Sequence, residues 1–132
     1  MDLNQVRISL DPVEMFLEHP LTGEVMDGET DPVFMIVPVE NEKVKSAERE
    51  FRNKLLKKMG SKNLGTAEEF DRQETEILMA SIVDWKNVED GTEVLTCTPQ
   101  NKRKLLTNPE LSWIRDQVKS FINTTQNFMT KA

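Results

Sequence analysis

The stretch Ile77-Leu78-Met79-Ala80-Ser81-Ile82-Val83-Asp84-Trp85 decides how the second half of the chain is organised. Its apolar residues recur at three- and four-residue steps, which predicts a helix that ends at Trp85. A polar loop with the turn dipeptide Asp90-Gly91 follows. Thr98-Pro99 and Asn108-Pro109 then each place a capping side chain before a proline, which is the usual opening of a helix. The sequence therefore predicts three helices separated by two start signals.

The last of these helices has the clearest apolar stripe in the chain. The stripe consists of Leu111, Ile114, Val118, Phe121, Ile122, Thr125, Phe128 and Met129. A helix this apolar on one side must bury that side, either on its own domain or in the groove of a partner protein. Trp113 lies beside the stripe. We take Trp113, Phe121 and Phe128 as candidate partner contacts.

Residues 1–40 have the pattern of β structure. Val6, Ile8 and Leu10 alternate with polar residues, and two further apolar runs follow at residues 13–17 and 33–37. A sheet this small must pack on helices to be stable. We therefore predict an α+β protein, with a small N-terminal antiparallel β portion at 1–40 and a mainly α-helical part at 41–132. The second part should hold four to five helices, and both parts should form one compact domain.

The helix that opens the second part is predicted from Asn41, as its cap, to Gly60, as its stop. Its apolar face carries Val44, Ala47, Phe51, Leu55 and Met59. Eight Lys and Arg residues lie between Lys43 and Lys62. They could bind an anion or nucleic acid, but residues 66–90 hold eight acidic residues, so we expect the two helices to pair their charges, within a subunit or between two.

Three lysines of this basic helix are our second set of candidate partner contacts: Lys54, Lys57 and Lys58. Ser61 to Gly65 is the predicted joint between this helix and the next. Thr66-Ala67-Glu68-Glu69 then has the spacing of a capping box. Trp85, at the far end of the second helix, is predicted to be a core residue.

Residues typical of catalysis are scarce. The chain has one cysteine, Cys97, and one histidine, His19, and no motif of a phosphate loop or a nucleophile elbow. A lone cysteine usually behaves as a small buried hydrophobe. Asp71 with Asp84-Trp85-Lys86 is similar to the acidic set of metal-dependent nucleases, which place that pair on a strand, whereas Asp84 is predicted to end a helix. We expect no enzyme activity, no metal and no cofactor.

Charge and composition exclude further classes. Residues 1–40 hold nine acidic residues against Arg7 alone, and the whole chain has a net charge of −6. Phosphate repels such a surface, and the absence of Tyr removes a common base-stacking residue, so a nucleic-acid partner is not expected. No apolar run reaches the length of a signal peptide or a membrane span. We expect a cytoplasmic protein.

The order of these features resembles that of the tail assembly chaperones of long-tailed bacteriophages. The matching positions are a helix ending in Trp85, the Asp90-Gly91 loop, the helix start Thr98-Pro99-Gln100-Asn101 and the pair Leu105-Leu106. They cover about the C-terminal half of the chain. The resemblance also agrees with an N-terminal β portion followed by helices.

The resemblance implies a function. Such chaperones bind the long helical tape measure protein, keep it soluble, and are displaced when tail tube subunits polymerise around it. It therefore implies the tape measure protein as partner, the major tail tube protein as a further candidate, and a homo-oligomer or several copies per partner. The protein would act in the host cytoplasm and be absent from the mature virion, and a longer frameshifted product often accompanies such a chain.

Two other functions stay open at this point. One is a structural virion component, such as a head–tail connector or tail-completion protein, which would be present in the mature particle. The other is a nucleic-acid-binding regulator that uses the Lys43–Lys62 helix, against which the acidic charge of the chain argues.

Overall fold

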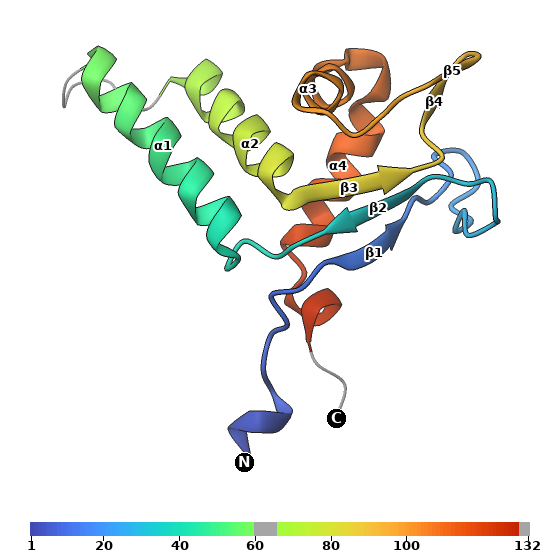
Figure 1. Ribbon diagram of the computed structural model, residues 1–132, viewed down its shortest axis with the longest axis horizontal. Helices are drawn as coiled ribbons and strands as arrows, with labels where there is room; N and C mark the ends of the chain where they lie inside the picture. Colours follow the sequence, from blue (N-terminus) through green and yellow to red (C-terminus); the bar gives the residue numbers. More distant parts are fainter. Residues whose placement is uncertain (60–65, 130–132) are drawn as a thin grey trace.

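The computed structural model describes residues 1–59 and 66–129, which form an α+β fold with an antiparallel sheet and four α-helices (Figure 1). The predicted fold class is confirmed. The strands are β1 (Val13–Phe16), β2 (Val33–Ile36), β3 (Ile82–Lys86), β4 (Glu89–Asp90) and β5 (Glu93–Val94). The helices are α1 (Glu42–Met59), α2 (Ala67–Ser81), α3 (Pro99–Thr107) and α4 (Ser112–Ile122). Short 3-10 helices are η1 (Leu3–Gln5), η2 (Pro109–Leu111) and η3 (Thr125–Phe128).

The main sheet has the order β1-β2-β3, and both of its pairings are antiparallel. Phe34 on the central strand lies opposite Met15 of β1 and Trp85 of β3. All three side chains are buried, and the Phe34 and Trp85 rings meet edge to face at 5.8 Å. Because alternate residues of a strand face opposite sides, this row marks the inner face of the sheet. The outer face carries exposed residues such as Glu14 and Asp84.

The prediction of a helix ending at Trp85 is wrong. Helix α2 ends at Ser81, and Ile82 to Lys86 form the third strand of the sheet. Met35 pairs with Asp84 whereas Ile36 pairs with Ile82, so Val83 is an extra residue in a β-bulge. The bulge puts Ile82 and Trp85, three residues apart, on the same inner face. The spacing of the buried residues Ile82 and Trp85 is therefore the same as in a helix, which explains the wrong prediction.

The first predicted strand is also wrong. Leu3–Gln5 form a 3-10 turn capped by Asp2, and Val6 and Leu10 are exposed. Ile8 makes an isolated bridge with Met129. Residues 6–10 alternate between apolar and polar side chains, but no described strand lies beside them with which they could form a β-ladder. The two later runs do form β1 and β2, as predicted.

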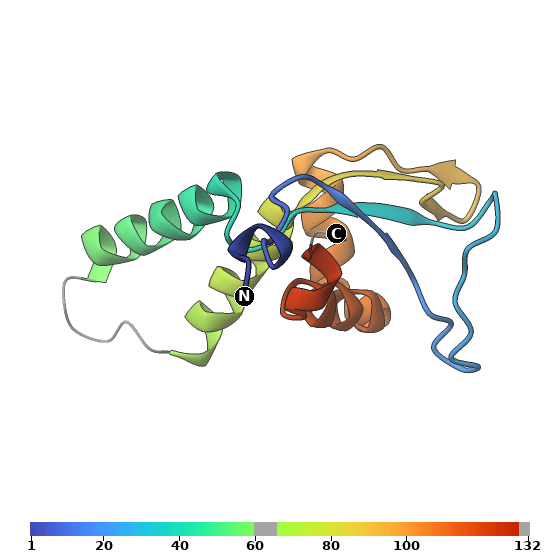
Figure 2. The same cartoon turned by 90° about the horizontal axis from the view of Figure 1, so that it is seen from below.

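One hydrophobic core draws on both halves of the chain. Helix α4 covers the inner face of the sheet (Figure 2), and its Ile114, Val118 and Ile122 are buried with Met15 and Phe34. The third strand thus comes from the part of the chain after residue 41, which we expected to be helical. Helices α1 and α2 pack on each other beside this core (Figure 2). The residue after β2 and the last residue of α2 are joined beside the sheet, because the Val37 amide donates to the Ser81 carbonyl at 2.9 Å.

The last apolar stripe is divided between two elements. Helix α4 ends at Ile122, and η3 carries the stripe on to Phe128. Thr124 Oγ1 donates to the Ser120 carbonyl, and Asn127 Nδ2 donates to the Phe121 carbonyl. These side chains bond the carbonyls that the next helical turn would have used, so the helix stops there.

The predicted starts at Asn41, Thr66 and Thr98 are confirmed, whereas Asn108-Pro109 opens the 3-10 helix η2, which leads into α4. Among the described residues, only the hydroxyl half of the predicted capping box forms, because Glu69 Oε2 is buried without a hydrogen-bond partner. Thr66, Thr98 and Asn108 each accept a hydrogen bond from a backbone amide in the first turn, and the Asn41 carboxamide accepts one from the Lys43 amide. The predicted stop at Gly60 and the joint at 61–65 lie outside the described residues.

The acidic face of α2 pairs with the last two helices. Arg115 of α4 bonds Asp71 and Glu74, Lys119 of α4 bonds Glu74, and Arg103 of α3 bonds Glu76. In the part of the chain that the structure describes, no α2 acid pairs with a base of α1. Within one chain the expected pairing between α1 and α2 is therefore wrong, because α3 and α4 pack on the face of α2 that carries these acids. Pairing between two subunits stays a prediction.

Glu74 makes this network sensitive to acid. Burial raises the pKa of Glu74, but Lys119 and Arg115 lower it more, so that it lies below its ordinary value of 4.5. The carboxylate therefore stabilises the fold fully above that ordinary pKa, and this contribution is lost as the pH falls through the lower, folded-state pKa. Glu74→Gln should cost about 1–2 kcal/mol at neutral pH and progressively less as the pH falls below 4.5. Urea unfolding over a series of pH values measures this, and a cost that does not change with pH would contradict the assignment.

Candidate protein-binding pocket

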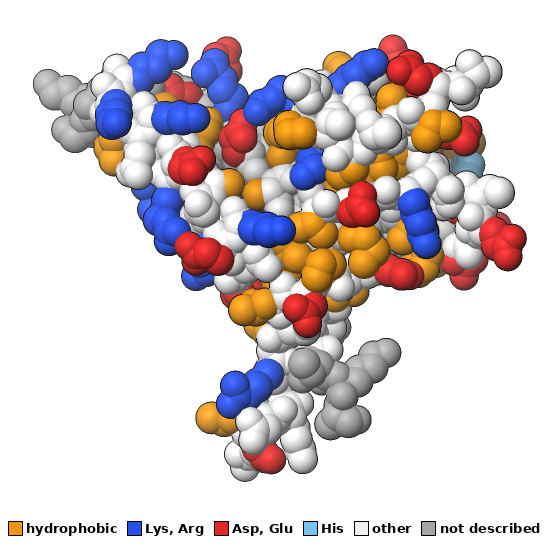
Figure 3. Space-filling view, in the orientation of Figure 1, with side chains coloured by type: hydrophobic (Ala, Val, Ile, Leu, Met, Phe, Trp, Pro, Cys, Tyr) orange, Lys and Arg blue, Asp and Glu red, His pale blue; other side chains and the backbone are white. Residues whose placement is uncertain are grey.

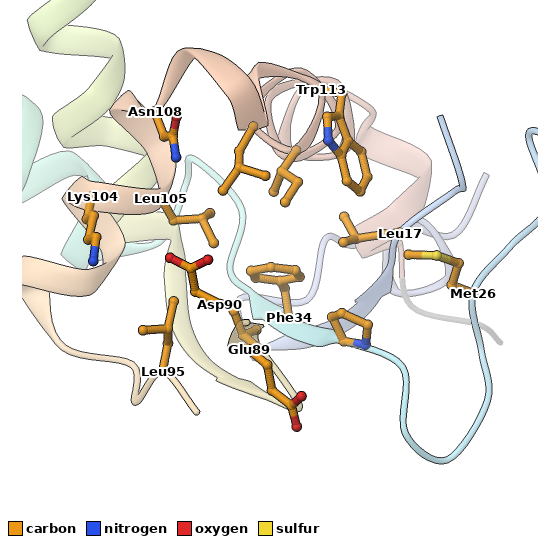
Figure 4. A pocket seen from close by; sticks show the side chains of 14 residues that line it. Leu17, Met26, Phe34, Glu89, Asp90, Leu95, Lys104, Leu105, Asn108 and Trp113 are labelled. Carbon is orange, nitrogen blue, oxygen red and sulfur yellow. The ribbon is translucent and has the colours of Figure 1, made fainter. Parts of the chain in front are cut away.

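A pocket of about 290 Å³ opens between the sheet, the β4–β5 hairpin and the helices α3 and α4 (Figure 4). Its floor is built from core side chains. Phe34 of β2, Leu105 of α3 and Ile114 of α4 are all less than a tenth exposed. Leu17, directly after β1, and Val88, directly before β4, complete the floor. The pocket is therefore a surface opening onto the core, and its walls are held by elements from the whole chain.

The rim combines apolar and charged side chains. Trp113 and Met26 stand together on one side, and Lys104 lies on the other (Figure 4). Asp90 points its carboxylate towards the space between Leu105 and Phe34, whereas the Glu89 carboxylate points outward (Figure 4). The pocket thus offers an apolar bottom with one acidic and one basic group at its mouth. This arrangement suits an apolar side chain that comes with polar or charged neighbours.

Two backbone turns hold the hairpin over the pocket. Gly91, with a φ of 66°, is the first of the two residues that link β4 to β5. Asn87, with a φ of 62°, turns the chain out of β3. Its Nδ2 donates to the carbonyls of Glu29 and Asp31, at 2.9 and 3.1 Å. The Trp85 indole nitrogen donates to the Leu95 carbonyl at 2.8 Å, which ties the end of the hairpin back to the sheet.

Asn87 should be needed for this wall of the pocket. An alanine there would keep the positive φ, at a cost of about 1–2 kcal/mol, and would lose both hydrogen bonds. We expect Asn87→Ala to lower the free energy of unfolding by about 2–3 kcal/mol. Asn87→Gly removes the same bonds without the strain, so it should cost clearly less. Chemical denaturation of both variants measures the difference, and equal costs would show that the turn is not strained.

The structure separates the three aromatic residues that the sequence proposed as partner contacts. Trp113 lines the pocket and is half-buried. Phe121 is half-buried and lines a second hollow, between β1 and α4. Phe128 is 2% exposed and packs edge to face on Phe121 at 5.5 Å. Phe128 is thus a core residue of the folded chain, and only Trp113 belongs to the pocket.

The three lysines of the second set lie elsewhere. Lys54, Lys57 and Lys58 are exposed on α1, which stands beside the sheet, and Figure 3 shows basic side chains along that helix. The pocket and these lysines are therefore two separate surfaces.

The sequence did not single out most of the pocket. Val33–Val37 and Leu105-Leu106 were recognised as apolar, but nothing in their pattern tells a pocket floor from closed core. The role of Asn87 also went unnoticed, although an Asn directly after a strand is a common turn residue.

The residues weighed for chemistry are not brought together as an active site. Asp84 lies on a strand, which corrects its predicted place at a helix end, and its Oδ1 accepts a hydrogen bond from the Trp85 amide. Asp71 instead meets Arg115. Burial raises the pKa of the Cys97 thiol, which disfavours the nucleophilic thiolate. Within residues 1–59 and 66–129, no group of three or more His, Cys, Asp or Glu side chains is placed to hold a metal ion.

A comparison with models of protein families identifies the family of this chain. The family model of the YdaY prophage protein matches residues 39–132, more than two thirds of the chain. The chain belongs to the YdaY prophage protein family. The match spans α1 to η3 and so includes most of the pocket, though not Leu17, Met26, Pro32 or Phe34.

Membership of the YdaY family makes this a phage-derived protein, as the resemblance implied. The family description names no activity and no partner. No curated protein and no solved structure matches the chain. None of the helices in the described part of the chain combines the length and apolar composition needed to cross a bilayer.

Proposed function

We propose that this protein is a phage tail assembly chaperone that binds apolar helical segments of the tape measure protein and keeps them soluble. The observation that carries the proposal is the pocket: an apolar floor of Phe34, Leu105 and Ile114 that opens at the surface of a phage-derived chain. Its volume of about 290 Å³ is at the low end for small-molecule sites. It suits the large side chains of one helical turn.

The charges at the mouth favour an amphipathic partner. Asp90 and Lys104 both lie on the side of the opening away from Trp113 and Met26 (Figure 4). A helix that inserts an apolar side chain can therefore place polar neighbours of either charge against that side. One such pocket gives a weak contact, and several copies along one long partner would add up through multivalency. In this proposal the protein is a binding protein without catalysis, works in the host cytoplasm, and is displaced by the major tail tube protein.

The first test is co-expression with the tape measure protein of the same phage, followed by size-exclusion chromatography. The proposal expects the tape measure protein to become soluble and to elute together with this chain. A tape measure protein that stays insoluble would contradict it. Presence of this chain in purified virions would favour the alternative, a structural component such as a head–tail connector or tail-completion protein.

A substitution at the rim tests whether the pocket is the binding site. Trp113→Ala removes a large, half-buried wall residue and should weaken binding of the tape measure protein at least about tenfold. Phe70→Ala is the matched control, because Phe70 is an exposed aromatic residue of α2, 58% exposed, that does not line the pocket. Titration of a fluorescent tape measure fragment measures both. Equal loss in the two variants would remove the pocket from the proposal.

A further inference from the structure

The outer edge of β1 is a second surface feature, separate from the pocket near Trp113. β1 is the last strand of its sheet, and β2 is its only strand partner among the described residues. A hollow of about 460 Å³ runs between this edge and α4. Its walls include Glu14, Phe16 and Glu18 on the strand side and Phe121 on the helix side. An unpaired strand edge is a template for an added strand.

The direction of the backbone groups follows from one bridge. Glu18 lies opposite Val25, and the hydrogen bonds around that pair run from the Met26 amide to the Leu17 carbonyl and from the His19 amide to the Glu24 carbonyl. The N–H and C=O of Glu18 itself therefore point away from the sheet. Since peptide groups alternate along an extended strand, those of Phe16 and Glu14 point to the same free edge.

Gln117 of α4 already occupies the first position along that edge. Its Nε2 donates to the Glu18 carbonyl and its Oε1 accepts from the Glu18 amide, both at 2.8 Å. The side-chain amide thus makes the two bonds that a peptide group of a neighbouring strand would make. These two bonds show that the backbone groups of this edge are oriented for pairing, and Phe16 and Glu14 lie further along the same hollow.

We propose that the β1 edge binds an extended segment of a partner protein in which basic and apolar residues alternate. One set of its side chains would lie beside Glu14 and Glu18 on the outer face, in the part of the chain where residues 1–40 carry a net charge of −8 (nine acidic residues against one arginine). These would be Lys or Arg. The other set would enter the hollow over Phe121 and would be apolar. This is recognition by strand addition, and it does not depend on the pocket near Trp113.

The test uses the full chain and two seven-residue probe peptides, Lys-Val-Lys-Val-Lys-Val-Lys and its Glu-Val counterpart. Amide hydrogen exchange followed by NMR is the readout. Without peptide, the Glu14 and Phe16 amides should exchange at least about tenfold faster than the Met15 amide, which faces β2. The Lys peptide should then slow both of them at least about tenfold, and the Glu peptide should not. Binding of the Lys peptide without this protection would be a charge effect only and would overturn the proposal, as would no binding.

Two variants separate the edge from other causes. Phe16→Pro removes an outward-facing N–H that no ladder bond to β2 uses, which edge strands tolerate, and should abolish protection by the Lys peptide. A double variant, Glu14→Lys with Glu18→Lys, leaves the backbone unchanged and should reverse the preference to the Glu peptide. If the free chain instead forms dimers that Phe16→Pro dissociates, the occupant is a second copy and the proposal fails. Trp113→Ala should leave peptide binding unchanged. A failure of the strand-addition proposal can therefore be distinguished from a failure of the proposal that the pocket binds the tape measure protein.

Discussion

Replacing Arg115 by alanine is expected to lower the free energy of unfolding by about 2–4 kcal/mol, because it leaves the buried Thr75 hydroxyl and the partly buried Glu74 carboxylate without their donor. The Arg115 side chain is only 12% exposed. Its guanidinium donates to Glu74 and Thr75 of α2, to both the carboxylate and the carbonyl of Asp71, and to the Leu106 carbonyl of α3. One side chain of α4 therefore joins three helices. Thermal unfolding should show a fall in Tm of roughly 10–15 °C.

Two controls test whether geometry or charge is responsible. Arg115→Lys keeps the charge but cannot reproduce the planar set of donors, so it should recover less than half of the loss. Arg103→Ala removes an exposed arginine that pairs with Glu76 and should cost less than about 1 kcal/mol. A loss at Arg103 as large as that at Arg115 would show that the network is not centred on the buried arginine.

The second large effect is expected at Phe128. Phe128→Ala should cost about 3–5 kcal/mol, the usual loss for a phenylalanine removed from a packed core. Phe128 is 2% exposed, supports the ring of Phe121, and its carbonyl accepts a hydrogen bond from the Ser9 amide at 2.7 Å. The variant should therefore also loosen the N-terminal segment. Urea unfolding and hydrogen exchange of the Ser9 amide measure the two effects.

Phe121→Ala is the matched control, since Phe121 is half-buried and faces the hollow beside β1. It should cost less than half as much. A Phe128→Ala protein of normal stability that no longer bound its partner would instead make Phe128 a contact residue, as the apolar stripe first indicated.

Caps and apolar periodicity made five of the elements predictable, namely α1, α3, η2, β1 and β2. Thr98-Pro99, Asn108-Pro109 and Asn41 act locally, through bonds to amides two or three residues away, and local signals can be read from a single sequence. The stripe of α1 and the runs that form β1 and β2 are regular enough to be recognised in the same way.

What could not be predicted depends on partners distant in the sequence. Ile82 to Lys86 became a strand because β2 offers a pairing edge, and the bulge at Val83 restores burial of Ile82 and Trp85 on one face. The charge partners of α2 were equally distant, since Arg115 lies 41 positions after Glu74. The pocket was harder still to predict, because it forms only where five separate elements leave a gap between them. Periodicity contains no information about such gaps.

The pairing of β2 with β3 has a kinetic consequence. These strands are separated by residues 37–81, so their contact requires the closure of a long loop, which slows folding. Most of that loop is α1 and α2, which pack on each other, and the Val37–Ser81 hydrogen bond joins the two ends of the loop. A helical pair that forms early would shorten the effective loop and bring the two strands into reach. The helix pair beside the sheet then matters for how quickly the core assembles, in addition to how stable it is.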